Sequence, residues 1–391
     1  MARAARPWPA AVYDAMRMRH GGWFGAGLFT VGCACSCLGS LDYLGDASSG
    51  TGTGGGGHTA VSASSTGGGG MNCGDPTTPD NCGACGHSCF GGECLEGVCQ
   101  PVVVASGQAE PFGIGVDADH VYWSNRGSRE IRRAPRMGGG DELVAASDTS
   151  PVAFVPTFLV VLPTLVAWTN VDAGSTSGYA LVSWTKSGGE PQGFAGDSPD
   201  ANAGLAAVGA SFYFGNFGAK DIRSAELGEA FVPIATTPSG PAQVAADQTH
   251  VYWTLELEEA NSVVRIPRQP EASSESLSPD VREASAITLD DSFVYVTSVT
   301  EIVRIPKQGG APEVLAGSQF QPTGIAVYGD LVYWTSASGE VLSTLKTGRA
   351  EPTVIATAQA GPTLVVVDAE QIYWTNAGDG PGSGSVMRIA R

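Results

Sequence analysis

Short runs of β-branched and aromatic residues recur throughout residues 101–391, and Gly, Pro, Asp or Asn bounds each run. Short runs of this composition between turn-forming residues are typical of strands and hairpins. No part of this region keeps the spacing of apolar residues that an amphipathic helix requires. The pattern therefore predicts an all-β fold for residues 101–391.

One phrase, an apolar residue followed by Tyr-Trp-Thr or a close variant, returns with a period of about 40 residues. Its copies lie at 121–125, 166–170, 212–216, 251–254, 294–297, 332–335 and 372–376. Each copy follows an apolar run and a polar turn, and precedes a second strand pattern, a turn and a short apolar strand. Four strands in about 40 residues is the blade of a β-propeller. We expect the Tyr and Trp side chains to form the core between blades.

The count of copies favours a seven-bladed β-propeller, with six blades as the alternative. The chain ends on the pattern of a third strand at Val386–Ile389, and no fourth strand follows it. Pro101–Ala105, directly after the last cysteine, has the pattern of a fourth strand without its blade. We expect this N-terminal strand to complete the last blade and close the ring, because closure leaves no open edge.

Residues 1–37 suit an export signal. Basic residues precede an uncharged and mostly apolar segment at 21–32, which is too short to span a bilayer comfortably. Val31-Gly32-Cys33 resembles the end of a bacterial lipoprotein signal, in which a small residue precedes the cysteine that is acylated. We predict lipidation of Cys33, and a plain export signal is the main alternative. Residues 38–71 are rich in Gly, Ser and Thr and predict a flexible tether.

Residues 72–100 predict a small disulfide module. So short a segment cannot bury a sufficient core and needs cross-links. Its six cysteines are Cys73, Cys82, Cys85, Cys89, Cys94 and Cys99. An even number in an exported chain indicates three disulfides with fifteen possible pairings. The alternative is a zinc site that uses Cys82 and Cys85. The spacing from Cys82 to Cys89 is similar to short cysteine-rich modules of bacterial secreted proteins, which implies no activity.

A family resemblance covers residues 101–391. Tyr-Trp-Thr-Asn, followed by Ile-x-Arg-x-Pro and a Gly turn, is similar to the YWTD-type propellers of the low-density lipoprotein receptor family and their bacterial relatives. Propellers of that family usually have six blades. The resemblance implies the propeller fold and protein binding, but it transfers no ligand.

The negative net charge of the chain argues against two classes of partner, nucleic acids and anionic membranes. The net charge of −18 repels phosphate backbones and anionic membrane surfaces. We therefore expect no nucleic acid partner and no membrane contact beyond the N-terminal lipid, and we expect a monomer.

Motifs of common catalytic sites are missing from the sequence, including Gly-x-Ser-x-Gly, His-Glu-x-x-His and the P-loop lysine motif. His120 and His250 occupy equivalent turns, so repetition explains them better than catalysis does. The same argument applies to the turn residues Asp117, Asp247, Asp290 and Asp368. We expect no cofactor and no metal, and we favour a binding protein over an enzyme.

The loops between second and third strands share one rim of a propeller, where binding residues are often found. Two of these loops are long, at 170–179 and 376–385, and we include Asn170 and Asn376 among the predicted binding residues. A third carries Glu256, Glu258 and Glu259. The alternative for these acids is a merely solvated loop.

These observations predict an exported, lipid-anchored protein of the cell surface, outer membrane or periplasm. Its propeller rim would bind a protein or glycan partner, in a binding or scaffold role. The alternative function is that of a metal-dependent propeller hydrolase or lyase with a site at the central funnel.

Lipidation of Cys33 can be tested by intact mass. The membrane-bound protein should weigh more than its mature polypeptide by the acyl groups on Cys33, and Cys33→Ser should abolish that increment. A mature wild-type mass without an acyl increment would contradict the prediction.

Overall fold

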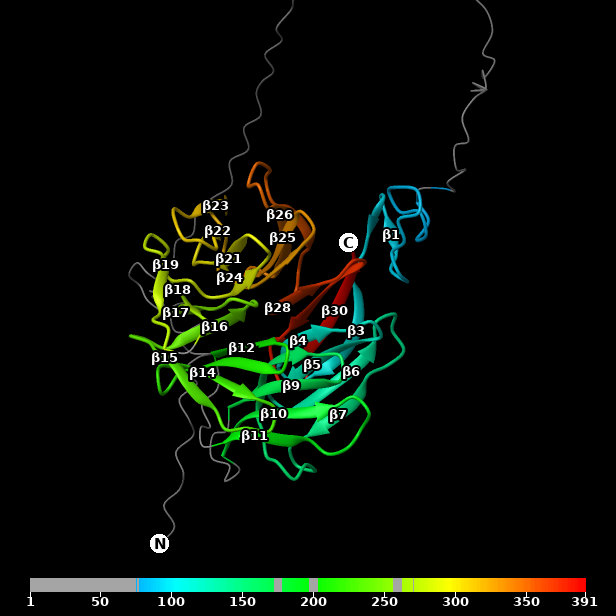
Figure 1. The fold of residues 1–391 in the computed structure, drawn as a ribbon. Helices are drawn as coiled ribbons and strands as arrows, with labels where there is room; N and C mark the ends of the chain where they lie inside the picture. The colour runs from blue at the N-terminus through cyan, green and yellow to red at the C-terminus, as the bar shows by residue number, and fades with distance from the viewer. Residues whose placement is uncertain (1–74, 76, 172–177, 197–202, 256–261, 270) are drawn as a thin grey trace, which may run out of the picture. The chain divides into compact units, whose positions relative to one another are not determined.

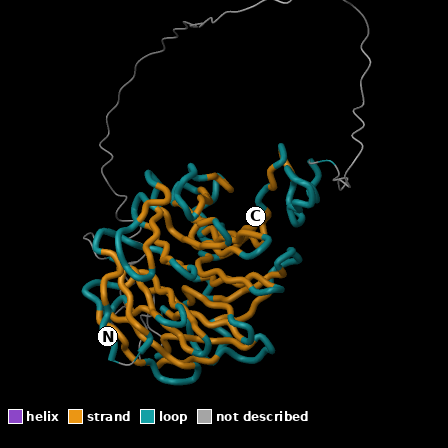
Figure 2. Tube along the Cα trace, turned by 45° about the horizontal axis from the view of Figure 1, so that its top comes forward, coloured by secondary structure: helices purple, strands orange, loops and turns teal. Residues whose placement is uncertain are grey.

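The computed structural model describes residues 75, 77–171, 178–196, 203–255, 262–269 and 271–391 (Figure 1). Residues Cys73–Arg391 form one compact unit. The predicted signal, the tether and Cys33 lie outside the described residues. Strands and loops account for everything described, as Figure 2 shows, and no described helix could cross a membrane.

The predicted seven-bladed β-propeller is confirmed by seven antiparallel sheets of four strands each. Blade one is β4 Pro111–Val116, β5 His120–Asn125, β6 Glu130–Pro135 and β7 Glu142–Ala146; blade two is β8 Pro156–Val161, β9 Leu165–Asn170, β10 Tyr179–Thr185 and β11 Gln192–Gly196. Blade three is β12 Ala203–Val208, β13 Ser211–Asn216, β14 Asp221–Glu226 and β15 Val232–Thr236; blade four is β16 Pro241–Ala246, β17 His250–Leu255, β18 Val263–Pro267 and β19 Glu275–Ser278. Blade five is β20 Ile287–Leu289, β21 Phe293–Thr297, β22 Ile302–Pro306 and β23 Glu313–Ala316; blade six is β24 Pro322–Tyr328, β25 Leu331–Ser336, β26 Glu340–Leu345 and β27 Thr353–Ala356.

Blade seven joins the two ends of the propeller sequence. It consists of β28 Pro362–Val367, β29 Gln371–Asn376, β30 Gly384–Ala390 and the N-terminal strand β3 Val102–Gln108. Val103 lies opposite Met387 in this antiparallel pair. In Figure 1 the cyan β3 accordingly runs beside the red β30. The predicted closure is confirmed, and the innermost strands contact one another in a complete ring from β4 through β28 and back to β4.

Seven clusters of buried side chains hold the ring together, and each combines residues of two neighbouring blades. In most of them the phrase Tyr of one blade meets the phrase Trp of the next. Tyr122 shares a cluster with Trp168, and Tyr373 of blade seven shares one with Trp123 of blade one. All four side chains are at most 1% exposed. The predicted inter-blade core is therefore confirmed.

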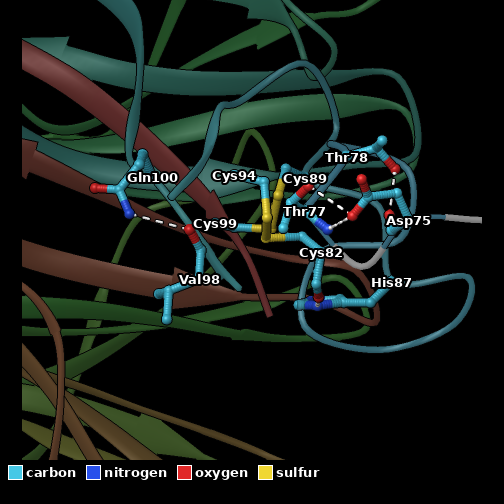
Figure 3. The surroundings of a disulfide bond; sticks show 10 residues. All are labelled: Asp75, Thr77, Thr78, Cys82, His87, Cys89, Cys94, Val98, Cys99 and Gln100. Atoms are coloured by element: carbon cyan, nitrogen blue, oxygen red, sulfur yellow. Dashed lines mark hydrogen bonds between the residues drawn. A yellow bond between two sulfur atoms is a disulfide. The ribbon is translucent and has the colours of Figure 1, made fainter. Parts of the chain in front are cut away.

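The segment before the propeller is a small disulfide module with one hairpin, β1 Cys94–Leu95 and β2 Val98–Cys99. Cys82 is bonded to Cys94 and Cys89 to Cys99 (Figure 3). Cys85 is also disulfide-bonded, and Cys73 lies outside the described residues. The disulfides contradict the alternative of a zinc site on Cys82 and Cys85, because their sulfurs are not thiolates.

Removal of the closing strand should destabilise the ring. Deletion of residues 101–106 leaves β30 without its outer partner, and we expect the melting temperature to fall by more than about 5 °C. Circular dichroism measures the melt. Deletion of the predicted tether at 38–71 is the control and should leave it unchanged. An unchanged melting temperature after deletion of residues 101–106 would contradict the proposed role of this strand in stability.

Candidate functional site

The antiparallel meander of each blade sorts its connections onto two rims. Loops between second and third strands and the links between blades lie at one end of the sheets, which we call the loop rim. Turns between first and second strands and between third and fourth strands lie at the other end, which we call the turn rim. Glu256, Glu258 and Glu259 belong to a loop outside the described residues, so their predicted role stays a prediction.

Asn170 and Asn376 end the second strands of blades two and seven, at the loop rim, and both are buried. The Asn170 amide donates to the carbonyl of Tyr179 at 3.0 Å and accepts from the backbone N–H of Val155 at 2.7 Å. The Asn376 amide donates to Gln359 Oε1 at 2.9 Å. These bonds brace the ends of strands, and contact of either side chain with a partner stays a prediction.

The turn rim carries a constellation that repeats from blade to blade. In blade four, Asp247 begins the turn between β16 and β17, and its Oδ1 accepts the backbone N–H groups of Thr249 at 2.8 Å and His250 at 2.9 Å. Its Oδ2 accepts the hydroxyl of Tyr252 at 3.2 Å. Asp at this position thus caps its own turn and reaches the Tyr of the second strand, as the turn chemistry of the sequence suggested.

A basic side chain from the following blade completes each constellation, which we call an inter-blade latch. It comes directly after the third strand of that blade, where sequence reasoning had assigned no role. Its nitrogen approaches the Asp of the preceding blade in four pairs: Lys186–Asp117 at 2.6 Å, Lys307–Asp247 at 2.7 Å, Lys346–Asp290 at 2.7 Å and Arg136–Asp368 at 2.6 Å. The signal in the sequence is the repetition of Lys or Arg at this one position.

Two further interfaces keep the cation and lose the acid. Arg391 of blade seven stacks on the Tyr328 ring, with its guanidinium carbon 4.5 Å from the centroid. Arg268 of blade four donates to the Tyr213 hydroxyl at 2.6 Å. The latch is therefore a general device between blades, and repetition alone would not make it a functional site.

The latches shift the acidity of their carboxyl groups. Burial by itself raises the pKa of Asp117 and Asp290, but the hydrogen bonds from Lys186 and Lys346 and from the turn backbone outweigh it. The pKa of each carboxyl falls from 3.8 to about 2. The same balance, with Lys307 as the cation, also lowers the pKa of Asp247. All three carboxylates are therefore ionised throughout the neutral range.

Between blades four and five the latch borders a cavity of about 390 Å³, which we call the cleft. Its walls come from the first turn of blade four and from both turns of blade five. The lining residues are Asp247, Gln248, Thr249, His250, Tyr252, Arg265, Asp291, Lys307 and Gln308. The volume lies within the range of small-molecule sites.

The cations of the cleft are neutralised by carboxylates of the protein. Lys307 lies 2.7 Å from Asp247, and Arg265 lies 2.6 Å from Glu275. Burial and the neighbouring Arg265 lower the pKa of His250 below 6.5, so its imidazole is neutral at pH 7. The cleft therefore offers a neutral imidazole and the amides of Gln248 and Gln308, which both donate and accept hydrogen bonds, and the carboxylate of Asp291, which accepts them.

A second cluster on the turn rim has the geometry of a cation site. One ligand atom each of Asp117, Asp119 and His120 lies within 4.8 Å of the others. The ammonium of Lys186 already lies 2.6 Å from Asp117. Because a lysine cation holds this carboxylate, we assign no metal to the cluster.

Comparisons with known proteins support the propeller fold but assign the chain to no family. No family model matches the sequence, and no curated protein matches it. The resemblance to YWTD-type propellers therefore stays a prediction.

Solved structures of similar fold include virginiamycin B lyase from Staphylococcus aureus, with a TM-score of 0.61 and 15% identity over 75% of this chain and 98% of that chain. A streptogramin B lyase gives a TM-score of 0.60 at 12% identity over 75% of this chain and 97% of its own. A catalytically inactive histidine-to-alanine variant of the S. aureus enzyme with quinupristin gives a TM-score of 0.60 at 15% identity over 75% of this chain and 98% of its own. Identities this low show that the propeller fold is shared.

The latches predict a loss of stability in acid. Their carboxyl groups have lower pKa values in the folded than in the unfolded chain, so the unfolded chain binds more protons as the pH falls. The stabilisation is complete above about pH 4 and is lost between about pH 4 and pH 2. Thermal melts across this range should show the loss.

Asp290→Asn tests one latch directly. The substitution leaves Lys346, whose side chain is 20% exposed, without its carboxylate, and should cost about 1–2 kcal/mol at pH 7. The difference from the wild type should shrink as the pH approaches 2. The exposed Asp148 provides the control, because Asp148→Asn removes a carboxylate that is outside the latches. A difference for Asp290→Asn that is independent of pH would argue against the latch.

Proposed function

We propose that this protein is an exported, lipid-anchored binding protein of the cell surface, outer membrane or periplasm. In this proposal the rigid propeller presents the cleft between blades four and five to a hydroxyl-rich ligand, such as a glycan. Export and anchoring rest on residues 1–37 and Cys33, and the ligand class rests on the cleft. The single observation that carries the ligand class is that both cations of the cleft are already paired with carboxylates of the chain.

Paired cations disfavour anionic ligands. An anion would have to compete with Asp247 for Lys307 and with Glu275 for Arg265, and the chain already carries a net charge of −18. Amides, a neutral imidazole and one carboxylate instead suit hydroxyl groups, which need donors and acceptors within one small space. These groups project from three separate turns, so strands of two blades fix their spacing, and little ordering is required on binding.

A lyase is the second candidate function. The structures named above belong to lyases, and the inactive variant among them has lost a histidine. In the cleft of this chain, His250 is a neutral imidazole that could accept a proton as a general base. Conversion of quinupristin by this protein, followed by chromatography and abolished in His250→Ala, would favour this function over a binding role.

The binding function can be tested with soluble oligosaccharides. Full-length protein is mixed with an N-acetylglucosamine trimer or with maltotriose, and saturation-transfer NMR reports contact. We expect one of these probes to bind with a dissociation constant of about 1 mM or tighter. Asp291→Asn and Gln308→Ala should each weaken binding at least several-fold, because each removes a group that faces the cleft.

Ser187→Ala is the matched control, because Ser187 occupies the position of Gln308 in blade two. It should bind like the wild type. Equal binding by all three variants would exclude the cleft as the binding site. If the replacement of Glu256, Glu258 and Glu259 by Ser abolished binding instead, the loop rim predicted from the sequence would be the binding surface.

A further inference from the structure

An arginine on the third strand and a glutamate on the fourth strand form a cross-strand pair in three blades. The pairs are Arg133–Glu142 at 3.0 Å, Arg265–Glu275 at 2.6 Å and Arg304–Glu313 at 2.6 Å. In blades two, three and six both members are replaced: Ser183 lies opposite Gln192, Ser224 opposite Val232 and Ser343 opposite Thr353. In six of the blades the two residues are thus present or absent together.

Blade seven breaks this pattern at its closing strand. Arg388 occupies the arginine position, and its partner in the register is Val102 of β3. Arg388 is 3% exposed, and its Nε has no hydrogen-bond partner among the described residues. Its other nitrogens donate to Gln371 Oε1 at 2.7 Å and to the carbonyl of Met137 at 3.3 Å. A buried cation without a carboxylate is costly, so whatever excludes water from it must be held firmly in place.

The disulfide module covers this arginine. A Cβ added to Gly91 would lie at an ordinary van der Waals distance of 3.7 Å from Arg388 Nη2, so the backbone of the module passes close to the guanidinium. At the neighbouring Gly92 a Cβ would lie 2.9 Å from the carbonyl oxygen of Gln100 and 3.1 Å from Val102 Cγ2. The turn Phe90–Gly92 is therefore packed tightly against Val102, the first residue of β3, and lies next to Arg388.

The core of the module is continuous with that of the propeller. Cys82, Cys89 and Cys99 belong to the same cluster of buried side chains as Trp374 and Met387 of blade seven. Phe90 packs against this cluster. The disulfide between Cys89 and Cys99 joins the residue just before the covering turn to the last residue of β2, three residues before β3 begins. The backbone N–H of Gln100 donates to the carbonyl of Glu93 at 2.9 Å. The module and the closing strand are thus mechanically connected.

We propose that the disulfide module is a clasp for the propeller: its disulfides hold the Phe90–Gly92 turn over Arg388 and thereby keep β3 paired with β30. A dithiol such as dithiothreitol opens the clasp. Each protein disulfide accepts two electrons and two protons to become two thiols, while the dithiol becomes its cyclic disulfide. The freed turn then admits water to Arg388, and the pairing of β3 with β30 loosens. Closure of the ring consequently depends on an oxidising surrounding.

Hydrogen exchange of the full-length protein, with and without dithiothreitol, tests the clasp. All nine cysteines lie at or before Cys99, so the reductant cannot act on the propeller directly. We expect amides of β3 and β30 to exchange about tenfold faster, or more, after reduction. Amides of β17 and β18 in blade four are the internal control and should keep their rates. Unchanged exchange in β3 and β30, or an equal rise in all blades, would overturn the proposal.

Two variants separate the disulfides from the arginine. The double variant Cys89→Ser, Cys99→Ser should show the fast exchange of β3 and β30 without reductant; if it does not fold, the reduced wild type still decides. Arg388→Met removes the buried cation and keeps an apolar stem, so reduction should accelerate exchange in β3 and β30 less than in the wild type. An equal acceleration in Arg388→Met would show that hydration of Arg388 is not the reason for the loosening.

Discussion

The contact on which this structure depends is that between the aromatic phrase of one blade and that of the next. A single blade of four strands has two apolar faces and cannot cover either of them alone. Packing Tyr122 against the blade that carries Trp168, with related contacts at the other interfaces, buries both faces of the second strand in every blade. Because the last interface joins blade seven to blade one, every blade has a neighbour on each side.

The side chains at an interface between blades can be replaced when the residues on both sides change together. Between blades two and three, Ala167 stands where other blades have Tyr, and Phe214 stands where five of the other blades have Trp. The latch positions of this same interface are Leu162 and Leu227 in place of the acid and the base. Losing both charges together avoids an unpaired carboxylate or ammonium at a half-buried place, whose cost would exceed the value of the pair. One apolar interface thus occurs in a ring whose other six interfaces carry a cation at the latch position.

Much of the fold could be predicted from the sequence, because a repeat displays its constraints many times. The phrase at 121–125 and its copies predicted the blades, and the strand pattern at 101–105 predicted the closing strand. The latches could not be predicted, since Lys186 and Asp117 belong to different repeats and neither is unusual alone. Asn170 was expected at a binding rim because it begins a long loop between second and third strands, but its side chain turns inward and bonds the backbone. Position along a strand does not reveal which way its last side chain points.

Blade seven combines the first and the last strand of the propeller, so the ring can close only when synthesis of the chain is nearly complete. Its outer strand, β3, is the first propeller strand to emerge, whereas its partner β30 is the last. The earlier blades can form their own hairpins as they appear, but blade seven must wait until residues 384–390 arrive. The propeller therefore stays an open arc until the end of its synthesis. Its final step joins residues separated by almost the full length of the ring, a contact of very high sequence separation that is intrinsically slow to form.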